Sequence, residues 1–284
     1  MANKLTGKEV AAAITENLVA RCEALNEKGV TPTLAILRVG ENSSDLAYER
    51  GATNRAAKVG VDLVKIVLEE TATTEEVVNE IKKLNDDNSI DGVLVFRPLP
   101  KHIDDDAVRN ALAKEKDVDG IGDDAMAGVY SGKDLGYPPC TAAACIEILK
   151  HYGVSMRGKR AVVVGRSLVI GRPVAMMLMH ENATVTICHT KTENMAEIAK
   201  EADIVIAAAG RANTVSVDFG KAGQTVIDVG INVDEDGNMT GDADFDGLFD
   251  IVENITPVPG GVGGVTTSIL MKHVIEAAEK SCNN

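Results

Sequence analysis

Apolar residues in the N-terminal third of the chain follow two patterns in turn. Short apolar runs rich in β-branched residues predict strands at 33–39, 61–68 and 90–96. Apolar residues spaced three or four apart predict helices at 6–28, 43–58 and 73–84. Because a helix separates each strand from the next, the strands are expected to lie parallel in one sheet with right-handed crossovers.

The alternation stops after residue 96. Two prolines, at positions 98 and 100, prevent further strand pairing. Asp104–Asp106 are expected to begin a short helix, and the stretch 116–139 is rich in glycine and polar residues and is predicted to be a loop. Long loops in compact domains usually carry function, so this stretch is a candidate part of a site.

The second half of the chain repeats the strand-helix alternation. A helix is predicted at 141–152, with further helices between the first three of the strands that follow. These strands are predicted at 161–164, 184–188, 204–207 and 225–229. The two prolines and four glycines of 255–267 predict a loop, and a last helix is predicted at 268–280.

These patterns predict an α/β protein of two domains, and 284 residues are enough for two separate cores. The first domain is predicted to comprise 1–140 plus the returning helix at 267–284. The second, 141–266, is predicted to be a Rossmann-like doubly wound parallel sheet. The active-site cleft is expected between the two domains.

A glycine-bearing turn follows the strand at 161–164. Gly165 ends the strand, Arg166 and Ser167 can form the turn, and Gly171 with Arg172 opens the next helix. A turn of this kind can bind a dinucleotide pyrophosphate, because free N–H groups and the helix dipole both favour an anion. The spacing differs from G-x-G-x-x-G, so the turn alone is also compatible with an ordinary strand-turn-helix connection.

Composition narrows the class of protein further. The chain carries 29 basic and 43 acidic residues, a net charge of −14, which disfavours nucleic acid and anionic membranes as partners. Five cysteines without C-x-x-C spacing indicate a reducing, cytoplasmic compartment, without a disulfide framework or a zinc site. No signal peptide is predicted, because residues 1–20 contain Lys4, Lys8, Glu9 and Glu16 and lack an unbroken apolar core. No membrane span is predicted, because the sequence lacks an apolar run of about 18 residues.

Seven short segments, taken in order, resemble the methylenetetrahydrofolate dehydrogenase/cyclohydrolase family over nearly the whole chain. They are VGENSSDLAY (39–48), GVLVFRPLP (92–100), KDVDG (116–120), PPCT (138–141), GKRAVVVGRSLVIGRP (158–173), VIDVGIN (226–232) and ITPVPGGVG (255–263). The resemblance implies a tetrahydrofolate derivative as substrate, a nicotinamide cofactor, and a homodimer.

The resemblance also implies the folate site. Tyr48 matches the tyrosine that stacks on the folate ring system, and Asp119 matches the aspartate that binds the pterin, so these two are the catalytic candidates. Without the resemblance, Tyr48 would be an ordinary half-buried tyrosine and Asp119 a turn residue. The folate-contacting loop of the family corresponds to Pro259, Gly260, Gly261, Val262 and Gly263. The family continues with Pro-Met-Thr, whereas this chain has Gly264-Val265-Thr266, a change expected to loosen the loop.

The cofactor is expected to be NADP in preference to NAD. An acid after the second Rossmann strand would bind the ribose 2′-hydroxyl of NAD, but this chain has Thr190 and Lys191 there and no acid before Glu193. The candidate cofactor-binding residues are Gly165, Arg166, Ser167, Gly171, Arg172, Thr190, Lys191 and Ile231.

Two positions depart from the family pattern. The family has a lysine four residues after the tyrosine and a glutamine in the strand at 90–96, and both serve the cyclohydrolase step. Here Ala52 and Phe96 occupy those places. We therefore predict a dehydrogenase with weak or absent cyclohydrolase activity. The alternatives are a bifunctional enzyme in which another group replaces the lysine, and a folate- or nucleotide-binding protein without catalysis.

Overall fold

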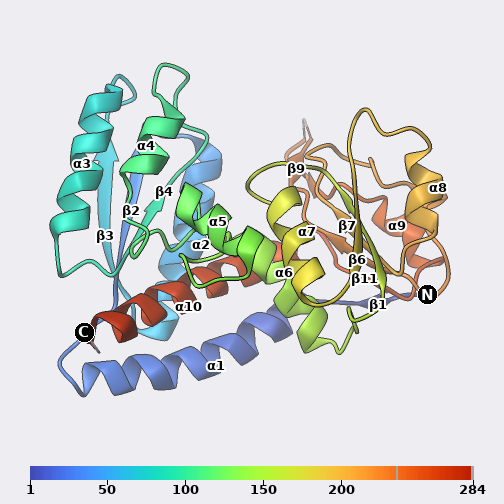
Figure 1. The fold of residues 1–284 in the computed structure, drawn as a ribbon, viewed down its shortest axis with the longest axis horizontal. Helices are drawn as coiled ribbons and strands as arrows, with labels where there is room; N and C mark the ends of the chain where they lie inside the picture. Colours follow the sequence, from blue (N-terminus) through green and yellow to red (C-terminus); the bar gives the residue numbers. More distant parts are fainter. Residues whose placement is uncertain (235, 283–284) are drawn as a thin grey trace. The chain divides into compact units, whose positions relative to one another are not determined.

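The computed structural model describes residues 1–234 and 236–282, and the chain forms two compact units (Figure 1). One unit comprises 1–12 and 141–266, and the other comprises 13–140 and 267–284. No helix within the described residues has the length and apolar character needed to cross a membrane.

The unit of 13–140 and 267–284 is built on a parallel sheet of order β3-β2-β4. Its strands are β2 (Thr33–Val39), β3 (Asp62–Leu68) and β4 (Gly92–Val95). The connecting helices are α2 (Ser43–Val59), α3 (Thr74–Asp86), α4 (Asp105–Ala111) and α5 (Asp123–Ser131). Each strand-to-strand connection contains a helix, as the hydrophobic pattern predicts.

The core of this sheet explains why β2 lies at its centre. Ala35 and Leu37 of β2 pack in one cluster with Val77 and Ile81 of α3, whereas the intervening Ile36 points to the opposite face and is also buried. A strand buried on both faces must be apolar throughout, as β2 is except for Thr33 and Arg38. Thr73 begins α3 with a capping box that includes Glu76.

The other unit contains a six-stranded sheet of order β1-β11-β8-β7-β5-β6, with every neighbouring pair parallel. Its strands are β1 (Asn3–Lys4), β5 (Arg160–Val164), β6 (Thr184–Cys188), β7 (Ile204–Ala207), β8 (Thr225–Asp228) and β11 (Asn254–Ile255). Its helices are α6 (Cys140–His151), α7 (Gly171–His180), α8 (Met195–Lys200), a 3-10 turn (Val217–Phe219) and α9 (Phe245–Phe249). A small antiparallel pair, β9 (Asn232–Val233) and β10 (Met239–Thr240), lies after β8.

The strand order creates a switch point in this sheet. From β5 the chain passes to β6 on one side and then to β7 on the other side. In open parallel sheets, ligands bind at the carboxyl ends of the strands where the order reverses. The carboxyl ends of β5 and β7 therefore mark the candidate cofactor site.

Three sequence-based expectations need correction. Residues 1–12 belong to the unit with the six-stranded sheet, not to the predicted first domain. The reason is that β1 pairs with β11 and forms an edge strand of that sheet. The predicted loop 116–139 contains α5. Asp123 and Asp124 stabilise the N-terminus of this helix, and Gly132 ends the helix in a left-handed conformation. The last two residues of the predicted first domain, 283 and 284, lie outside the described residues.

The third correction concerns the last helix, α10 (Val262–Cys282), which begins inside the predicted loop 255–267. Val262 and Val265 are both buried, and their spacing of three places them on one helix face. Their burial stabilises a first turn that Gly263 and Gly264 would otherwise disfavour, so Gly264 is part of a helix, not of a loosened loop.

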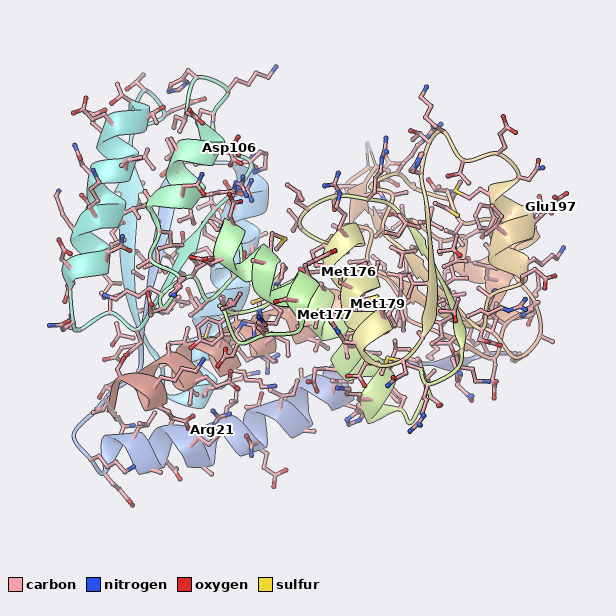
Figure 2. All side chains as sticks on the ribbon, in the orientation of Figure 1. Arg21, Asp106, Met176, Met177, Met179 and Glu197 are labelled. Atoms are coloured by element: carbon pink, nitrogen blue, oxygen red, sulfur yellow. The ribbon has the colours of Figure 1, made fainter. Side chains whose placement is uncertain are left out.

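An ion pair anchors the C-terminal part of α10. Arg21, labelled in Figure 2, lies on α1 (Gly7–Asn26) and donates through Nε and Nη2 to the Glu279 carboxylate at 2.9 and 2.6 Å. A bidentate pair of this kind fixes orientation as well as distance. This ion pair fixes α10, the helix that also contains His273, whose side chain contacts the Val118 carbonyl next to Asp119.

Candidate active site

Tyr48 and Asp119 belong to the same unit, and their side chains interact electrostatically. Tyr48 lies on α2, and Asp119 follows the segment that pairs with β4 through the Val93 N–H and the Lys116 carbonyl. Burial raises the pKa of Tyr48 well above its ordinary value, and the negative charge of Asp119 raises it further. Tyr48 therefore stays a neutral phenol, suited to stacking and to hydrogen bonding.

Asp119 carries the most informative ionisation in this region. The pKa of its carboxyl is raised to about 7, mainly by burial and also by the charge of Asp117, while the Cys140 thiol and Arg97 oppose the shift. A carboxyl group with a pKa near neutrality, in a partly exposed position, is typical of functional sites. In its ionised form it can accept two hydrogen bonds from a flat, amino-bearing heterocycle.

The turn beside Asp119 is held by a different aspartate. Asp117 accepts hydrogen bonds from the N–H groups of Ile121 and Gly122 at 3.0 and 2.8 Å. The turn-forming role that one could assign to Asp119 from its Asp-Gly sequence is thus performed by Asp117. Asp117 was not among the predicted site residues, although its place in the KDVDG segment is a signal for it.

Ala52 and Phe96 lie beside Tyr48, and neither offers a polar side-chain atom. Ala52 is one helical turn after Tyr48 and fully buried, and Phe96 follows β4 directly. The Phe96 ring meets the Tyr48 ring edge-on, with ring centroids 5.7 Å apart and an interplanar angle of 89°. The Arg97 side chain instead forms a bidentate ion pair with Asp105, in which the Nε–Oδ1 distance is 2.6 Å.

The predicted folate loop belongs to the unit with the six-stranded sheet. Pro259 and Gly260 are exposed, and the Gly260 carbonyl accepts a hydrogen bond from the Gly7 N–H at 2.8 Å. Gly261 is buried against Gly7, so close that a Cβ on Gly7 would lie 2.0 Å from the Gly261 carbonyl oxygen. Val262 and Gly263 form the first turn of α10. Their assignment to folate remains a prediction.

The glycine turn after β5 lies at the switch point of the sheet. Gly165 has φ +132°, and a Cβ there would lie 2.0 Å from the Ala208 carbonyl oxygen, just after β7. A Cβ on Gly171 would meet the Gly165 carbonyl oxygen at 2.4 Å. Glycine is thus required at both positions to bring the ends of β5, β7 and α7 together. Ser167 Oγ accepts hydrogen bonds from the Ile170 and Gly171 N–H groups at 3.1 and 3.4 Å.

The remaining cofactor candidates follow the carboxyl ends of β5, β6 and β8, in loops or, for Arg172, in the first turn of α7. Thr190 and Lys191 are exposed in a turn after β6, where the Lys191 N–H donates to His189 Nδ1 at 3.2 Å. Arg172 Nε donates to the Arg166 carbonyl at 3.1 Å, which ties the two basic residues of the glycine turn together. Ile231 follows β8 with 62% of its surface exposed.

This edge of the sheet fits a dinucleotide. The glycine turn allows close backbone packing, Arg166 and Lys191 supply positive charge, and exposed aliphatic side chains offer a surface for a flat ring. These aliphatic side chains are Leu168, Val169 and Ile231. The residues present are therefore compatible with a nicotinamide dinucleotide.

Replacing Gly165 with alanine should destabilise the protein by about 3 kcal/mol or more, because the new Cβ clashes with a backbone carbonyl and φ is unfavourable. Gly223→Ala is the matched control: Gly223 has φ +79° but no atom within 4 Å of a Cβ, so only about 1 kcal/mol of strain is expected. Thermal unfolding midpoints measure both. Equal losses for the two variants would contradict the close approach of β5 and β7.

Fold and site together define a two-unit α/β protein with a nucleotide-binding Rossmann-like unit and a second unit that carries a carboxyl group beside a tyrosine. Residues 5–119 match the catalytic domain of tetrahydrofolate dehydrogenase/cyclohydrolase, and residues 139–282 match the NAD(P)-binding domain of the same family. The chain belongs to the tetrahydrofolate dehydrogenase/cyclohydrolase family.

Relatives agree over the full length. The chain is 52% identical to the bifunctional protein FolD of Alkaliphilus oremlandii, over 100% of this chain and 99% of that protein. It is 49% identical to the bifunctional protein FolD of Clostridioides difficile, over 98% of this chain and 97% of that protein.

Solved structures agree as well. The bifunctional FolD enzyme of Campylobacter jejuni superposes with a TM-score of 0.96 at 36% identity, covering 99% of this chain and 100% of that one. The FolD enzyme of Trypanosoma brucei, complexed with NADP and an inhibitor, superposes with a TM-score of 0.95 at 34% identity, covering 100% of this chain and 99% of that one.

Proposed function

We propose that this chain oxidises 5,10-methylenetetrahydrofolate to 5,10-methenyltetrahydrofolate, with transfer of a hydride to NADP. The observation that carries the proposal is the Asp119 carboxyl beside Tyr48, in a chain whose other unit has a glycine turn at the switch point of a parallel sheet. The nicotinamide ring, when bound, supplies the hydride acceptor. Tyr48 would stack on the folate, and Asp119 would hold the pterin by accepting hydrogen bonds.

The protein contributes position more than chemistry in this reaction. Nitrogen atoms of the substrate stabilise the cation that develops as the hydride leaves, so no general acid or base is required. Apolar Ala52 and Phe96 next to Tyr48 are compatible with such a step. The meeting of the two ligands in a cleft, the homodimer and the cytoplasmic location remain predictions.

The test of this function is reduction of NADP that depends on methylenetetrahydrofolate, followed by near-ultraviolet absorbance. Tyr48→Ala is expected to lower the rate, and heat-treated protein is the blank. Folate binding without any NADP or NAD reduction would instead support the alternative of a folate- or nucleotide-binding protein without catalysis.

Preference for NADP over NAD is proposed from the turn after β6. Lys191 and Thr190 are exposed there, and no acid occupies the place where NAD-specific enzymes bind the ribose 2′-hydroxyl. The FolD enzyme of Trypanosoma brucei, a full-length structural relative, was solved with NADP.

Lys191→Ala should lower kcat/KM for NADP about tenfold, because it removes a charge-assisted contact to the 2′-phosphate, while kcat/KM for NAD stays within about twofold. Lys200→Ala removes an exposed lysine from α8 and is the matched control. Initial rates with both cofactors give the ratio. An unchanged ratio would mean that Lys191 points only to solvent.

A second candidate function is hydrolysis of the methenyl product to 10-formyltetrahydrofolate by the same chain. Relatives at 52% and 49% identity are named bifunctional proteins, which favours this alternative over the predicted weak or absent cyclohydrolase. Ala52 and Phe96 instead support weak or absent cyclohydrolase activity, because neither side chain can transfer a proton. Enzyme-dependent decay of methenyltetrahydrofolate, measured against the buffer rate, decides between the two.

A further inference from the structure

A buried histidine, His273, contacts the backbone of Val118, the residue before Asp119, and has no part in the reaction as proposed so far. His273 lies on α10 with 4% of its surface exposed. Its Nδ1 atom is 2.8 Å from the Val118 carbonyl oxygen and 3.6 Å from Cys140 Sγ. Its ring packs against Tyr137, with ring centroids 5.0 Å apart.

The surroundings of His273 fix its protonation. A carbonyl oxygen only accepts hydrogen bonds, so Nδ1 must carry the proton that points at Val118. Burial lowers the pKa of His273 to about 4, so the imidazole is neutral at neutral pH. His273 is therefore a fixed single donor to one backbone atom.

The Val118 carbonyl receives a second donor. The Cys140 Sγ atom lies 3.3 Å from the same oxygen and also contacts the Asp119 carboxyl, so its single S–H proton is shared between these two acceptors. A carbonyl has two lone pairs, so both donors can be accommodated, and Val118 itself is fully buried. Gly92 leaves room for Val118, because a Cβ at Gly92 would lie 2.7 Å from a Val118 methyl.

The orientation of the Val118 carbonyl determines where Asp119 points. The peptide bond is planar, so the carbonyl of Val118 and the N–H of Asp119 turn together. Rotation of this plane would swing the Cα–Cβ bond of Asp119 away from its present direction. On the other side of Asp119, the carboxylate of Asp117 holds Ile121 and Gly122.

We propose that His273 is a positioning residue for substrate binding: its Nδ1–H, with the Cys140 thiol, holds the Val118 carbonyl and thereby aims the Asp119 carboxyl at the pterin. The inference rests on the proposed folate-binding role of Asp119. It assigns to α10 a part in substrate recognition through the backbone, without contact between His273 and the substrate.

Three variants test the donor. His273→Asn keeps an N–H donor at about the position of Nδ1, His273→Gln carries the same amide group one carbon further out, and His273→Leu removes the donor but keeps bulk. The KM for methylenetetrahydrofolate should rise about tenfold in the leucine variant and severalfold in the glutamine variant. The asparagine variant should stay within about twofold of the parent protein, and the KM for NADP should not change in any of them.

The outcomes separate this inference from the proposed function. If the leucine and glutamine variants keep the folate KM of the parent, or if asparagine fails to restore it while glutamine does, the positioning role is wrong. If the leucine variant does not fold, the comparison of asparagine with glutamine decides by itself. Calorimetry with 5-formyltetrahydrofolate, a stable folate probe, tests the two claims separately. If the parent protein does not bind the probe, the proposed function fails. If the parent and all variants bind it equally, only the role of His273 is wrong.

Discussion

Replacing Asp119 with alanine should weaken binding of methylenetetrahydrofolate about 10- to 100-fold and leave the affinity for NADP nearly unchanged. A hydrogen bond to a charged group contributes about 1.5–3 kcal/mol, and each 1.4 kcal/mol is about tenfold in affinity. Asp119 lies in the unit of 13–140, whereas the glycine turn lies in the other unit. The KM values for folate and cofactor, measured separately, test this separation.

The same carboxyl group should set the pH dependence of substrate capture. Its pKa is about 7, raised by burial and by Asp117 and opposed by the Cys140 thiol and Arg97. The ionised form accepts the pterin hydrogen bonds and dominates above pH 7, so kcat/KM for folate should fall as the pH drops below about 7. Asp119→Asn should flatten this limb of the profile.

Asp124→Ala is the matched control for Asp119→Ala. Asp124 is an exposed acid in the first turn of α5, in the same segment of the chain. Its replacement therefore removes the same charge without changing the site. Loss of cofactor affinity in Asp119→Ala, or a large fall in its thermal midpoint, would instead indicate a structural role. A kcat/KM that rises as the pH falls would show that the protonated acid binds folate.

Combining Ala52→Lys with Phe96→Gln should raise the rate of methenyltetrahydrofolate hydrolysis about 100-fold or more above that of the parent chain. Water addition and ring opening require proton transfers, and a placed proton-transfer group typically contributes about 10²–10⁴ in rate. The two positions lie beside Tyr48, where the resemblance places the lysine and glutamine of the family.

Two arginines that lie near these positions in the sequence, Arg55 and Arg97, have other partners. Arg55 Nη1 donates to Thr15 Oγ1 at 2.9 Å, and Arg97 pairs with Asp105. Arginine also stays charged and is a poor proton shuttle. These contacts are the physical reason to expect little hydrolysis from the parent chain, although the names of its relatives favour a bifunctional enzyme.

The single variants Ala52→Lys and Phe96→Gln are the controls, and the decay of methenyltetrahydrofolate is the measurement. Each single variant should show a smaller gain than the pair, and NADP reduction should persist in all three. If the parent chain already hydrolyses the methenyl compound far above the buffer rate, the prediction of weak or absent cyclohydrolase activity is wrong. The bifunctional alternative would then hold for this chain.

Elements with a local signal can be predicted from the order of residues alone. The apolar run of β2 and the spacing in α3 arise from residues that are close along the chain, and each has the period of its own structure. The same holds for the glycine turn after β5, because a positive φ such as that of Gly165 strongly favours glycine. The roles of Tyr48 and Asp119 came instead from the resemblance to a family, through segments that are local in the sequence, and they remain predictions.

Features that depend on residues distant in the sequence became visible only in the folded chain. The two residues of β1 are too few to show a period, and they form a strand because β11, far along the chain, offers a free edge. The first turn of α10 contains two adjacent glycines, and burial of Val262 and Val265 outweighs their low propensity. The contact of Phe96 with Tyr48 and the hydrogen bond of His273 to Val118 join residues far apart in sequence. Such pairs carry no periodic signal, because long-range packing, not local preference, brings them together.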